Sequence, residues 1–233
     1  MKKILFLSLI TLFFFACNES NTGNNKKDKV DKTEEQTKTA SKSSKIQYPF
    51  KSGIVKYENK AMGRKTNLTL YFKDYGKLEC SVSKINMGEQ SMTIRSLIKD
   101  GYLYSIADAQ KNGTKMKVDN SYSTYIIDPE LFKKKLSEIN GKKLGTEKIL
   151  GRTCQVYSMN ENGAESKMWI WKNMMLKMSA NQNGLSMTME AKSIEETDKF
   201  PKGVFNVPST YTITEEPDMD MDVDDFDSEN AAG

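Results

Sequence analysis

The sequence predicts a mainly β protein, in which short strands follow one another as an antiparallel meander. Apolar and polar residues alternate with the two-residue period of a strand over much of the chain. Turn signals separate these stretches, because Asn-Gly and Asp-Gly pairs tolerate the positive φ angles of tight hairpins. These pairs stand at 100–101, 112–113, 140–141, 162–163 and 183–184. A sandwich, a barrel or a partial barrel would each fit this pattern.

Eleven strands are expected from the alternation, with a short twelfth near 210–214. In the eleventh, Leu185, Met187 and Met189 share one face and the polar residues between them share the other. The expected strands cover residues 53–62, 66–73, 77–86, 90–99, 102–109, 114–118, 146–150, 153–159, 165–172, 174–182 and 185–195.

One helix interrupts the predicted strands. Asp128 is a favourable N-cap, and Pro129 suits the first helical position. Phe132, Leu136 and Ile139 form an apolar stripe, after which Asn140-Gly141 ends the helix. Such a helix can cover an open face of a curved sheet.

The first sixteen residues have the pattern of a secretory signal peptide. Two lysines precede a run of about a dozen apolar residues, and Ala16 stands directly before Cys17. The run is shorter than the roughly 20 residues that a membrane-spanning helix needs. Phe14 to Cys17 resembles the lipobox of bacterial lipoproteins, with Phe14 where the pattern has Leu. That resemblance implies cleavage before Cys17 and lipid on its sulfur, so the membrane is a predicted partner.

The remainder divides by composition into a tether, a body and a tail. Residues 17–45 are rich in Asn, Lys, Thr, Ser and Glu, which predicts a disordered tether after the lipidated cysteine. Residues 214–233 hold nine acidic residues and no basic one, which predicts a disordered acidic tail. The body, 46–213, is long enough for one domain with its own core.

The body is basic, with 26 Lys and Arg against 17 Asp and Glu, a net charge of +9. Scattered lysines are interpreted first as an ordinary solvated surface. The alternative is a basic face for anionic lipid head groups or another polyanion. No nucleic-acid partner is predicted.

The residue inventory argues against the common hydrolytic and metal sites. The chain has no histidine, which excludes Ser-His-Asp and Cys-His catalysis and the usual zinc sites. No enzyme activity, cofactor or metal site is predicted. Besides Cys17 there are Cys80 and Cys154, which would either form a disulfide or remain buried free thiols.

Several motifs together resemble an uncharacterised family of envelope lipoproteins related to the LolA/LolB-like lipoprotein-carrier superfamily. The likeness covers roughly residues 50–211. The motifs are Gly53 to Tyr57, Tyr71 to Gly76, Gly145 to Tyr157, Trp169 to Lys172 with Leu176-Lys177, and Phe205 to Pro208. The resemblance implies an incomplete antiparallel β-barrel, or half-barrel, with the helix over its concave apolar face. In the carriers, that cavity holds acyl chains.

Methionine marks the candidate binding site. Seven of the fourteen methionines lie between 159 and 189, and methionine suits adaptable apolar surfaces. One interpretation is a pocket for acyl chains or another apolar ligand; the alternative is a closed core. The pocket would be lined by Trp169, Trp171, Met178, Leu185, Met187 and Met189.

The expected function is therefore a non-enzymatic, lipid-anchored envelope lipoprotein that binds a lipid or other apolar ligand. The alternative is a structural or protein-interaction lipoprotein with a closed core and an unidentified protein partner. Asn18 is not the aspartate that retains lipoproteins at the inner membrane of enteric bacteria. By that analogy, the outer membrane is the expected location.

Overall fold

The computed structural model describes residues 48–87, 90–118, 123, 125–161 and 163–217. Residues 46–219 form one compact unit. Within the described residues the chain forms twelve strands, one α-helix and a short 3-10 turn, η1 (Asp74–Gly76). In chain order, the elements are β1 (Gly53–Ala61), β2 (Arg64–Lys73), β3 (Leu78–Met87), β4 (Gln90–Lys99), β5 (Tyr102–Ala107), β6 (Asn112–Lys117), α1 (Pro129–Glu138), β7 (Lys142–Ile149), β8 (Arg152–Glu161), β9 (Ala164–Trp171), β10 (Met174–Gln182), β11 (Leu185–Glu196) and β12 (Thr212–Glu215).

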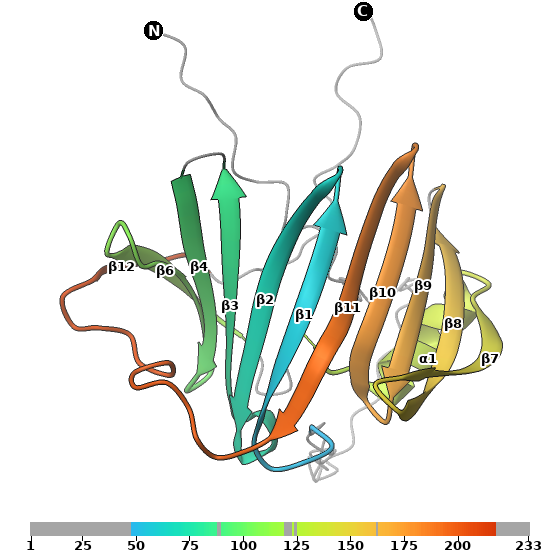
Figure 1. Cartoon of the computed structure of the whole chain (residues 1–233), viewed down its shortest axis with the longest axis horizontal. Coiled ribbons are helices and arrows are strands. Elements are labelled where there is room, and N and C mark those ends of the chain that lie inside the picture. The colour runs from blue at the N-terminus through green and yellow to red at the C-terminus, as the bar shows by residue number, and fades with distance from the viewer. Residues whose placement is uncertain (1–47, 88–89, 119–122, 124, 162, 218–233) are drawn as a thin grey trace, which may run out of the picture. The chain divides into compact units, whose positions relative to one another are not determined.

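All twelve strands belong to one sheet, in the order β12-β6-β5-β4-β3-β2-β1-β11-β10-β9-β8-β7. Two arms meet at the antiparallel pair β1–β11. The first arm runs from β1 to β6 and ends at β12, and the second arm runs from β11 back to β7 (Figure 1). The predicted half-barrel is confirmed, because β12 and β7 are the two edges of an open sheet.

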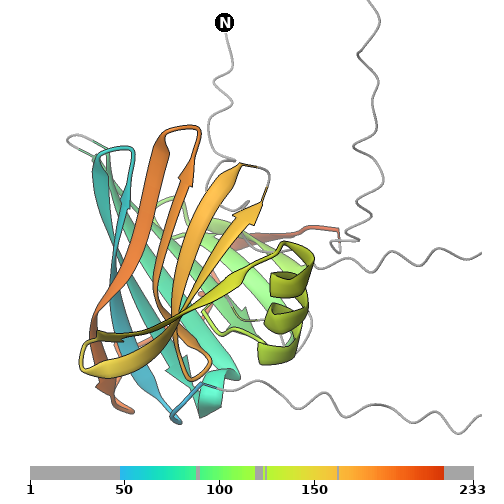
Figure 2. The same ribbon diagram turned by 90° about the vertical axis from the view of Figure 1, so that its right-hand side faces the viewer.

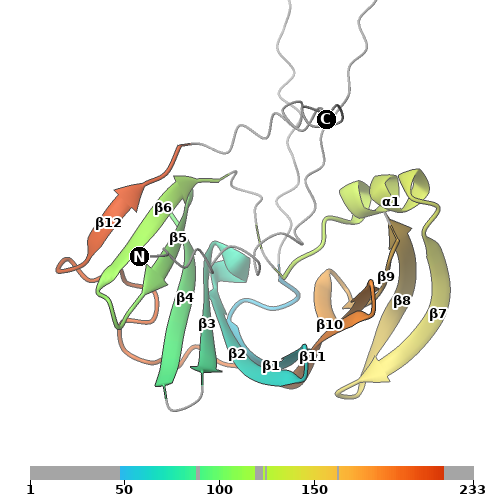
Figure 3. The ribbon, with the colours of Figure 1, turned by 90° about the horizontal axis from the view of Figure 1, so that it is seen from above.

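The sheet curves into a trough when it is seen from above (Figure 3). Helix α1 lies beside β7–β9 on the concave side of this trough, as the side view also shows (Figure 2). The predicted helix start is confirmed, since Asp128 Oδ1 accepts a hydrogen bond from the Glu130 backbone N–H at 2.8 Å. The apolar stripe of Phe132, Leu136 and Ile139 packs against the core.

One strand pair differs from the expected antiparallel pattern. β12 lies parallel to β6, with Thr212 opposite Asn112 and Glu215 opposite Lys115. The reason is the long connection 197–211, which returns along the outside of the first arm and brings the chain to β6 in the same direction. Hairpin turns predict pairing only between strands that follow one another in sequence. They could therefore not predict the pairing of β12 with β6.

The core of the described residues consists of two clusters. The larger cluster lies among β1, β2 and the second arm, and includes Tyr57, Leu70, Phe72, Met168 and Met174, all at most 2 % exposed. The smaller cluster lies on the outer face of β3–β5. Here Phe200, Val204 and Phe205 of the connection 197–211 cover Cys80, Leu97 and Ile106.

Candidate functional site

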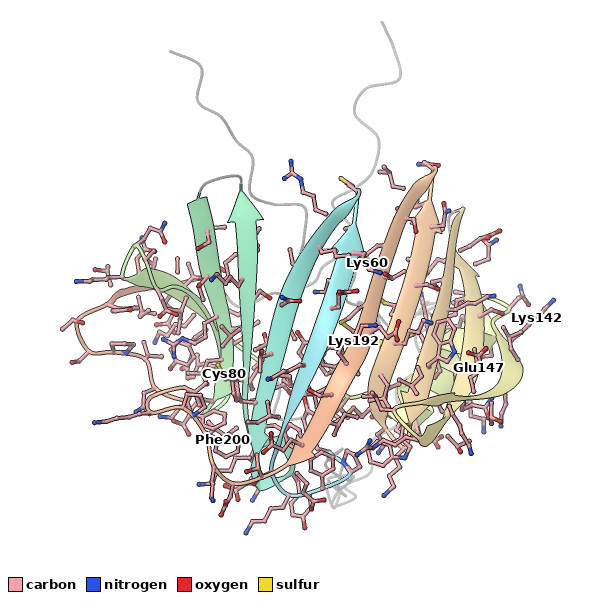
Figure 4. The ribbon with its side chains drawn as sticks, viewed as in Figure 1. Lys60, Cys80, Lys142, Glu147, Lys192 and Phe200 are labelled. Atoms are coloured by element: carbon pink, nitrogen blue, oxygen red, sulfur yellow. The ribbon has the colours of Figure 1, made fainter. Side chains whose placement is uncertain are left out.

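The strand register gives the sheet two chemically different faces, because successive side chains point to opposite sides. Tyr57 on β1 pairs with Leu68 on β2, and Leu70 lies two residues further along β2 on the same side. These three side chains define the concave face. The convex face at the centre of the sheet is charged, and Figure 4 shows Lys60 and Lys192 on it. Ion pairs of this face join Lys60 and Lys65 to Glu58, and Lys177 and Lys192 to Glu190.

Aromatic rings close one end of the concave face. This lower end in Figure 1 is where β1 starts and where the β2–β3 turn lies. The Tyr48 ring stacks on Phe72 with centroids 4.0 Å apart, and Phe50 lies 5.0 Å from the same ring. Tyr57 stacks on Tyr125 at 5.6 Å. The protein's own side chains therefore fill this part of the trough.

A buried carboxylate ties these segments together. Tyr48 Oη donates to Glu79 Oε2 at 2.5 Å, and Ser123 Oγ donates to the same oxygen at 2.7 Å. Burial, with Glu79 beside it, raises the pKa of Tyr48 well above its ordinary value. The phenol thus stays protonated and remains a donor over the physiological range.

The segment 125–127 crosses to the second arm just before α1. Ile126 forms an isolated antiparallel bridge with Met174, and the Ile127 N–H donates to the Asn173 carbonyl at 2.8 Å. Tyr57 Oη donates to the Met175 carbonyl at 3.0 Å. These bonds place α1, whose Phe132 ring meets Tyr157 edge-on at 4.9 Å.

Apolar side chains on the concave face of β3–β6 lie outside both core clusters. The register places them on the Leu68 side of the sheet, since Leu68 pairs with Ser83, Ser83 with Ile94, and Ile94 with Ala107. Each is partly exposed. They are Ile85, Met92, Ile94, Leu103 and Met116. Their convex neighbours pack with the connection 197–211, whereas neither core cluster of the described residues includes these five side chains.

Four of the predicted ligand-binding residues come together on the concave face of the second arm. Met178 pairs with Met189, and Met187 lies on the same side two residues earlier. Met189 is 8 % exposed and belongs to the core, while Met178 and Met187 are half-buried. Leu185 lies at the upper end beside the β10–β11 turn and is 55 % exposed. Whether they bind a ligand stays a prediction.

The two tryptophans do not join this set. Trp169 pairs with Lys177, which pairs with Glu190 of the convex face. Its indole N–H donates to Glu147 Oε2 at 2.7 Å, and the Lys177 ammonium lies 4.7 Å from its ring. Trp171 is half-buried under the Arg152 guanidinium at 4.9 Å. A bulge at Met175 shifts the register here, so sequence alternation alone could not assign the faces.

Cys80 and Cys154 are both buried free thiols. Cys80 lies on β3 and Cys154 on β8, with five strands between them in the sheet. Six steps of about 4.8 Å between strands far exceed the Cα separation that a disulfide allows. Of the two alternatives that the sequence left open, the structure has the free thiols. Cys17, the predicted lipidation site, lies outside the described residues.

Sequence reasoning missed two features of the concave face. It identified the strands that carry Ile94 and Leu103, but it did not join them to the methionines of the second arm, because β1–β11 pairing is not sequential. It also missed Asn59, whose buried Oδ1 has no hydrogen-bond partner among the described residues. Asn59 pairs with Met189 and with Thr66, at the centre of the face.

Two negative findings concern the described part of the chain. No helix there is long and apolar enough to cross a membrane. No three acidic, cysteine or histidine side chains of these residues gather as metal ligands would.

No protein-family model matches the sequence, and no curated protein matches it either. Solved structures of similar shape include the following three. An uncharacterised conserved protein from Thermus thermophilus has 6 % identity and a TM-score of 0.49, over 71 % of this chain and 91 % of that one. A chain of the Pseudomonas aeruginosa MucA/MucB complex has 10 % identity and a TM-score of 0.45, over 70 % and 58 %. The Mycobacterium tuberculosis lipoprotein LppX has 11 % identity and a TM-score of 0.33, over 64 % and 89 %.

This chain thus spans little more than half of the matched chain from the MucA/MucB complex. All three TM-scores lie below 0.5, so these likenesses carry no argument about ligand or partner.

Proposed function

We propose that this chain is a non-enzymatic, lipid-anchored lipoprotein of the bacterial envelope, which binds a lipid or another apolar ligand on the concave face of its half-barrel. The observation that carries the proposal is the partly exposed apolar surface of β3–β6. These strands carry apolar side chains on both faces, and among the described residues the connection 197–211 packs against those of the convex face. A partly exposed apolar surface of this kind typically marks a binding site.

The second arm supplies the opposite wall of the proposed site. Met178 and Met187 are half-buried and flexible, so they can adjust to a chain-like ligand. Asn59 between the two arms offers an acceptor that a hydroxyl or amide group of such a ligand could satisfy. Hydroxyl groups on the same face, Ser83 and Ser96, suit a neutral polar group better than a charge.

The ligand proposal is tested by filling the trough from each arm. Ile94→Trp and Met187→Trp should each weaken binding of a fluorescent fatty-acid probe by about tenfold. Both should cost less than about 1 kcal/mol of unfolding free energy, because an open surface accepts added bulk. Thr93→Trp and Thr188→Trp are matched controls, since these neighbours point to the convex face; they should leave probe binding unchanged. The protein would be residues 17–233 with Cys17→Ser.

A closed core is the second candidate, and the rings of Tyr48, Phe50 and Tyr125 favour it for the lower end. In that case the protein serves a structural or protein-interaction role. The same tryptophan variants would then lose roughly 1–3 kcal/mol by overpacking. Absence of probe binding to the parent protein, together with that loss, would refute ligand binding.

The anchor proposal has its own test. The mature wild-type protein should begin at Cys17 and carry acyl mass there, and Cys17→Ser should abolish both the added mass and detergent partitioning. At least two acyl chains are expected, because one chain binds membranes marginally. Intact-mass measurement of full-length protein that keeps Met1 to Ala16, or of an unmodified Cys17, would contradict the proposal.

A further inference from the structure

The lower end of the sheet carries large apolar and aromatic side chains that the fold leaves partly exposed. Tyr75 in the β2–β3 turn and Leu150 in the β7–β8 turn are each 42 % exposed. Trp171, at the end of β9, is half-buried. The antiparallel pairings of β1, β2, β7, β8, β9 and β10 bring all of these turns to the end where β1 starts.

Contacts through the buried rings of Tyr48 and Phe50 link these side chains. Gly76, next to Tyr75, lies so close to Tyr48 that an added Cβ would stand 2.5 Å from its ring. Phe50 lies 6.5 Å from the Trp171 ring, centroid to centroid. The Arg152 guanidinium lies 4.9 Å from the centroid of the Trp171 ring and donates through Nη1 to the Leu150 carbonyl at 3.2 Å.

The backbone at this surface is conformationally costly for the residues it carries. Tyr75 has φ 59° and Leu150 has φ 50°, in the left-handed region where Gly, Asn and Asp are usual. The fold places bulky apolar side chains there and leaves them partly in water.

Basic side chains frame the same surface. Lys73 and Lys77 flank the turn of Tyr75 and are exposed, and the Lys172 ammonium lies 5.2 Å from the Trp171 ring. Asp74 contributes one opposing charge in that turn. Tryptophan and tyrosine beside lysine and arginine are typical of the boundary between lipid head groups and water, where one end of each side chain is apolar and the other is wet.

We propose that this lower end is a docking surface for a lipid bilayer, with Tyr75, Leu150 and Trp171 entering the head-group layer. The path of the chain supports this occupant. The described chain begins at Tyr48, whose ring is packed at this end, so the segment from the predicted lipid on Cys17 arrives at the same end. Residues 18–47 can reach about 100 Å at most, so the anchor and the surface can engage one membrane. The surface is separate from the proposed ligand site on the concave face.

The test uses residues 17–233 with Cys17→Ser, so that no acyl anchor contributes. Trp169→Phe leaves Trp171 as the single tryptophan of the two in the chain. Vesicles of phosphatidylcholine and phosphatidylglycerol with brominated acyl chains should quench its fluorescence and co-sediment with the protein. In the matched Trp171→Phe protein, Trp169 should not be quenched, because it lies within β9 away from the turns.

A second pair of variants locates the surface. Tyr75→Ser with Leu150→Ser should weaken vesicle binding by about a hundredfold, which corresponds to roughly a factor of ten for each side chain that leaves the head-group layer. Met62→Ser with Leu185→Ser is the control, because these residues are 64 % and 55 % exposed beside the β1–β2 and β10–β11 turns at the opposite end. It should bind vesicles as the parent does. Both double variants should keep their thermal midpoints, and Tyr75→Ser with Leu150→Ser should also keep its binding of the fatty-acid probe.

Vesicle binding without quenching of Trp171, or equal loss in the two double variants, would overturn the docking proposal. So would a failure of the parent protein to bind these vesicles. Because the fatty-acid probe is measured separately, a failed docking surface leaves the ligand proposal intact, and a failed ligand proposal leaves docking intact.

Discussion

Arg95 is a charged side chain buried on the convex face of β4, where its neighbours are apolar. Its guanidinium donates to both carboxylate oxygens of Asp108, at 2.9 and 3.3 Å. It also donates to the carbonyls of Val204 and Asn206, at 3.3 and 2.7 Å. One residue thereby fixes the connection 197–211 against the first arm, and a planar fork of donors suits this task better than a lysine would.

Replacing Arg95 should therefore destabilise the protein through the connection. Arg95→Met keeps much of the apolar stem but leaves Asp108 and two carbonyls without their donor, and should cost about 2–4 kcal/mol of unfolding free energy. Chemical denaturation would measure the loss. Arg95→Lys should recover only part of it, and the exposed Lys84→Met on β3 is the control. An Arg95→Met protein as stable as the parent would show that the connection does not depend on this contact.

The two body cysteines should behave as protected thiols. Burial raises the pKa of the Cys80 thiol to about 12 and raises that of Cys154 as well. In the Cys17→Ser protein at pH 8, iodoacetamide should modify neither residue until the protein is unfolded, and a reductant should leave the thermal midpoint unchanged. Because Cys80 keeps its proton in the fold but loses it near pH 9 when unfolded, stability should decline from about pH 9 toward pH 12. Fast labelling of native protein would contradict this.

The sequence predicted the face of the sheet that a site residue occupies only where the strand alternates strictly. Met178, Met187 and Met189 fall on one face because no bulge intervenes between Lys177 and Gln182 or between Leu185 and Glu190. The tryptophans, by contrast, sit next to the bulge at Met175 and turn to the other face. A bulge adds one residue to a strand without a distinct sequence signal. It therefore moves the following residues to the opposite face, and the sequence alone does not reveal this change.

At the scale of elements, the turn residues determined most of the fold. β10 covers the expected residues and β1 nearly does. Gly63 and Gly184, in the turns that follow these two strands, adopt the positive φ that tight turns need. β7 begins at Lys142 rather than near 146. The sequence did not predict this start, because the residues of this edge strand from Lys142 to Lys148 are all exposed and show no apolar alternation. The pairing of β12 with β6 could not be predicted, since it depends on the return of a segment without periodicity.

Helix α1 is expected to gain its stability from its apolar stripe more than from its charges. Phe132→Ala removes the edge-on contact with Tyr157 and should cost about 1–3 kcal/mol, since the ring is half-buried. Lys135→Ala breaks the 2.6 Å ion pair with Glu161, yet should cost less than about 1 kcal/mol because the pair lies partly in water. Thermal or chemical unfolding would compare the stability losses of the two variants. A larger loss for Lys135→Ala would show that the ion pair stabilises α1 more than the apolar stripe does.

The whole molecule combines a basic body with an acidic tail. The boundary between them was expected at residue 214, but β12 includes Glu215, whose carboxylate lies 3.0 Å from the Lys115 ammonium. The Glu216 N–H also donates to the Lys115 carbonyl at 2.8 Å. The composition of residues 214–233 assigned these two acidic residues to the tail. Their interactions with Lys115 on β6 depend on the fold, which composition does not contain. The limits of the folded body therefore extend at least to Glu216.

Truncation would test these limits in the Cys17→Ser protein. Deleting 18–45 or 218–233 should shift the thermal midpoint by no more than about 2 °C, because both segments are poor in residues that build a core. Deleting 212–233 should lower it by several degrees more, since that change also removes β12, the Lys115 ion pair and the contact of Ile213 with Gly113. The comparison between 218–233 and 212–233 isolates the strand from the acidic tail. Equal midpoints for these two deletions would mean that β12 adds nothing to the sheet, and a large loss on deleting 18–45 would move the start of the body towards Cys17.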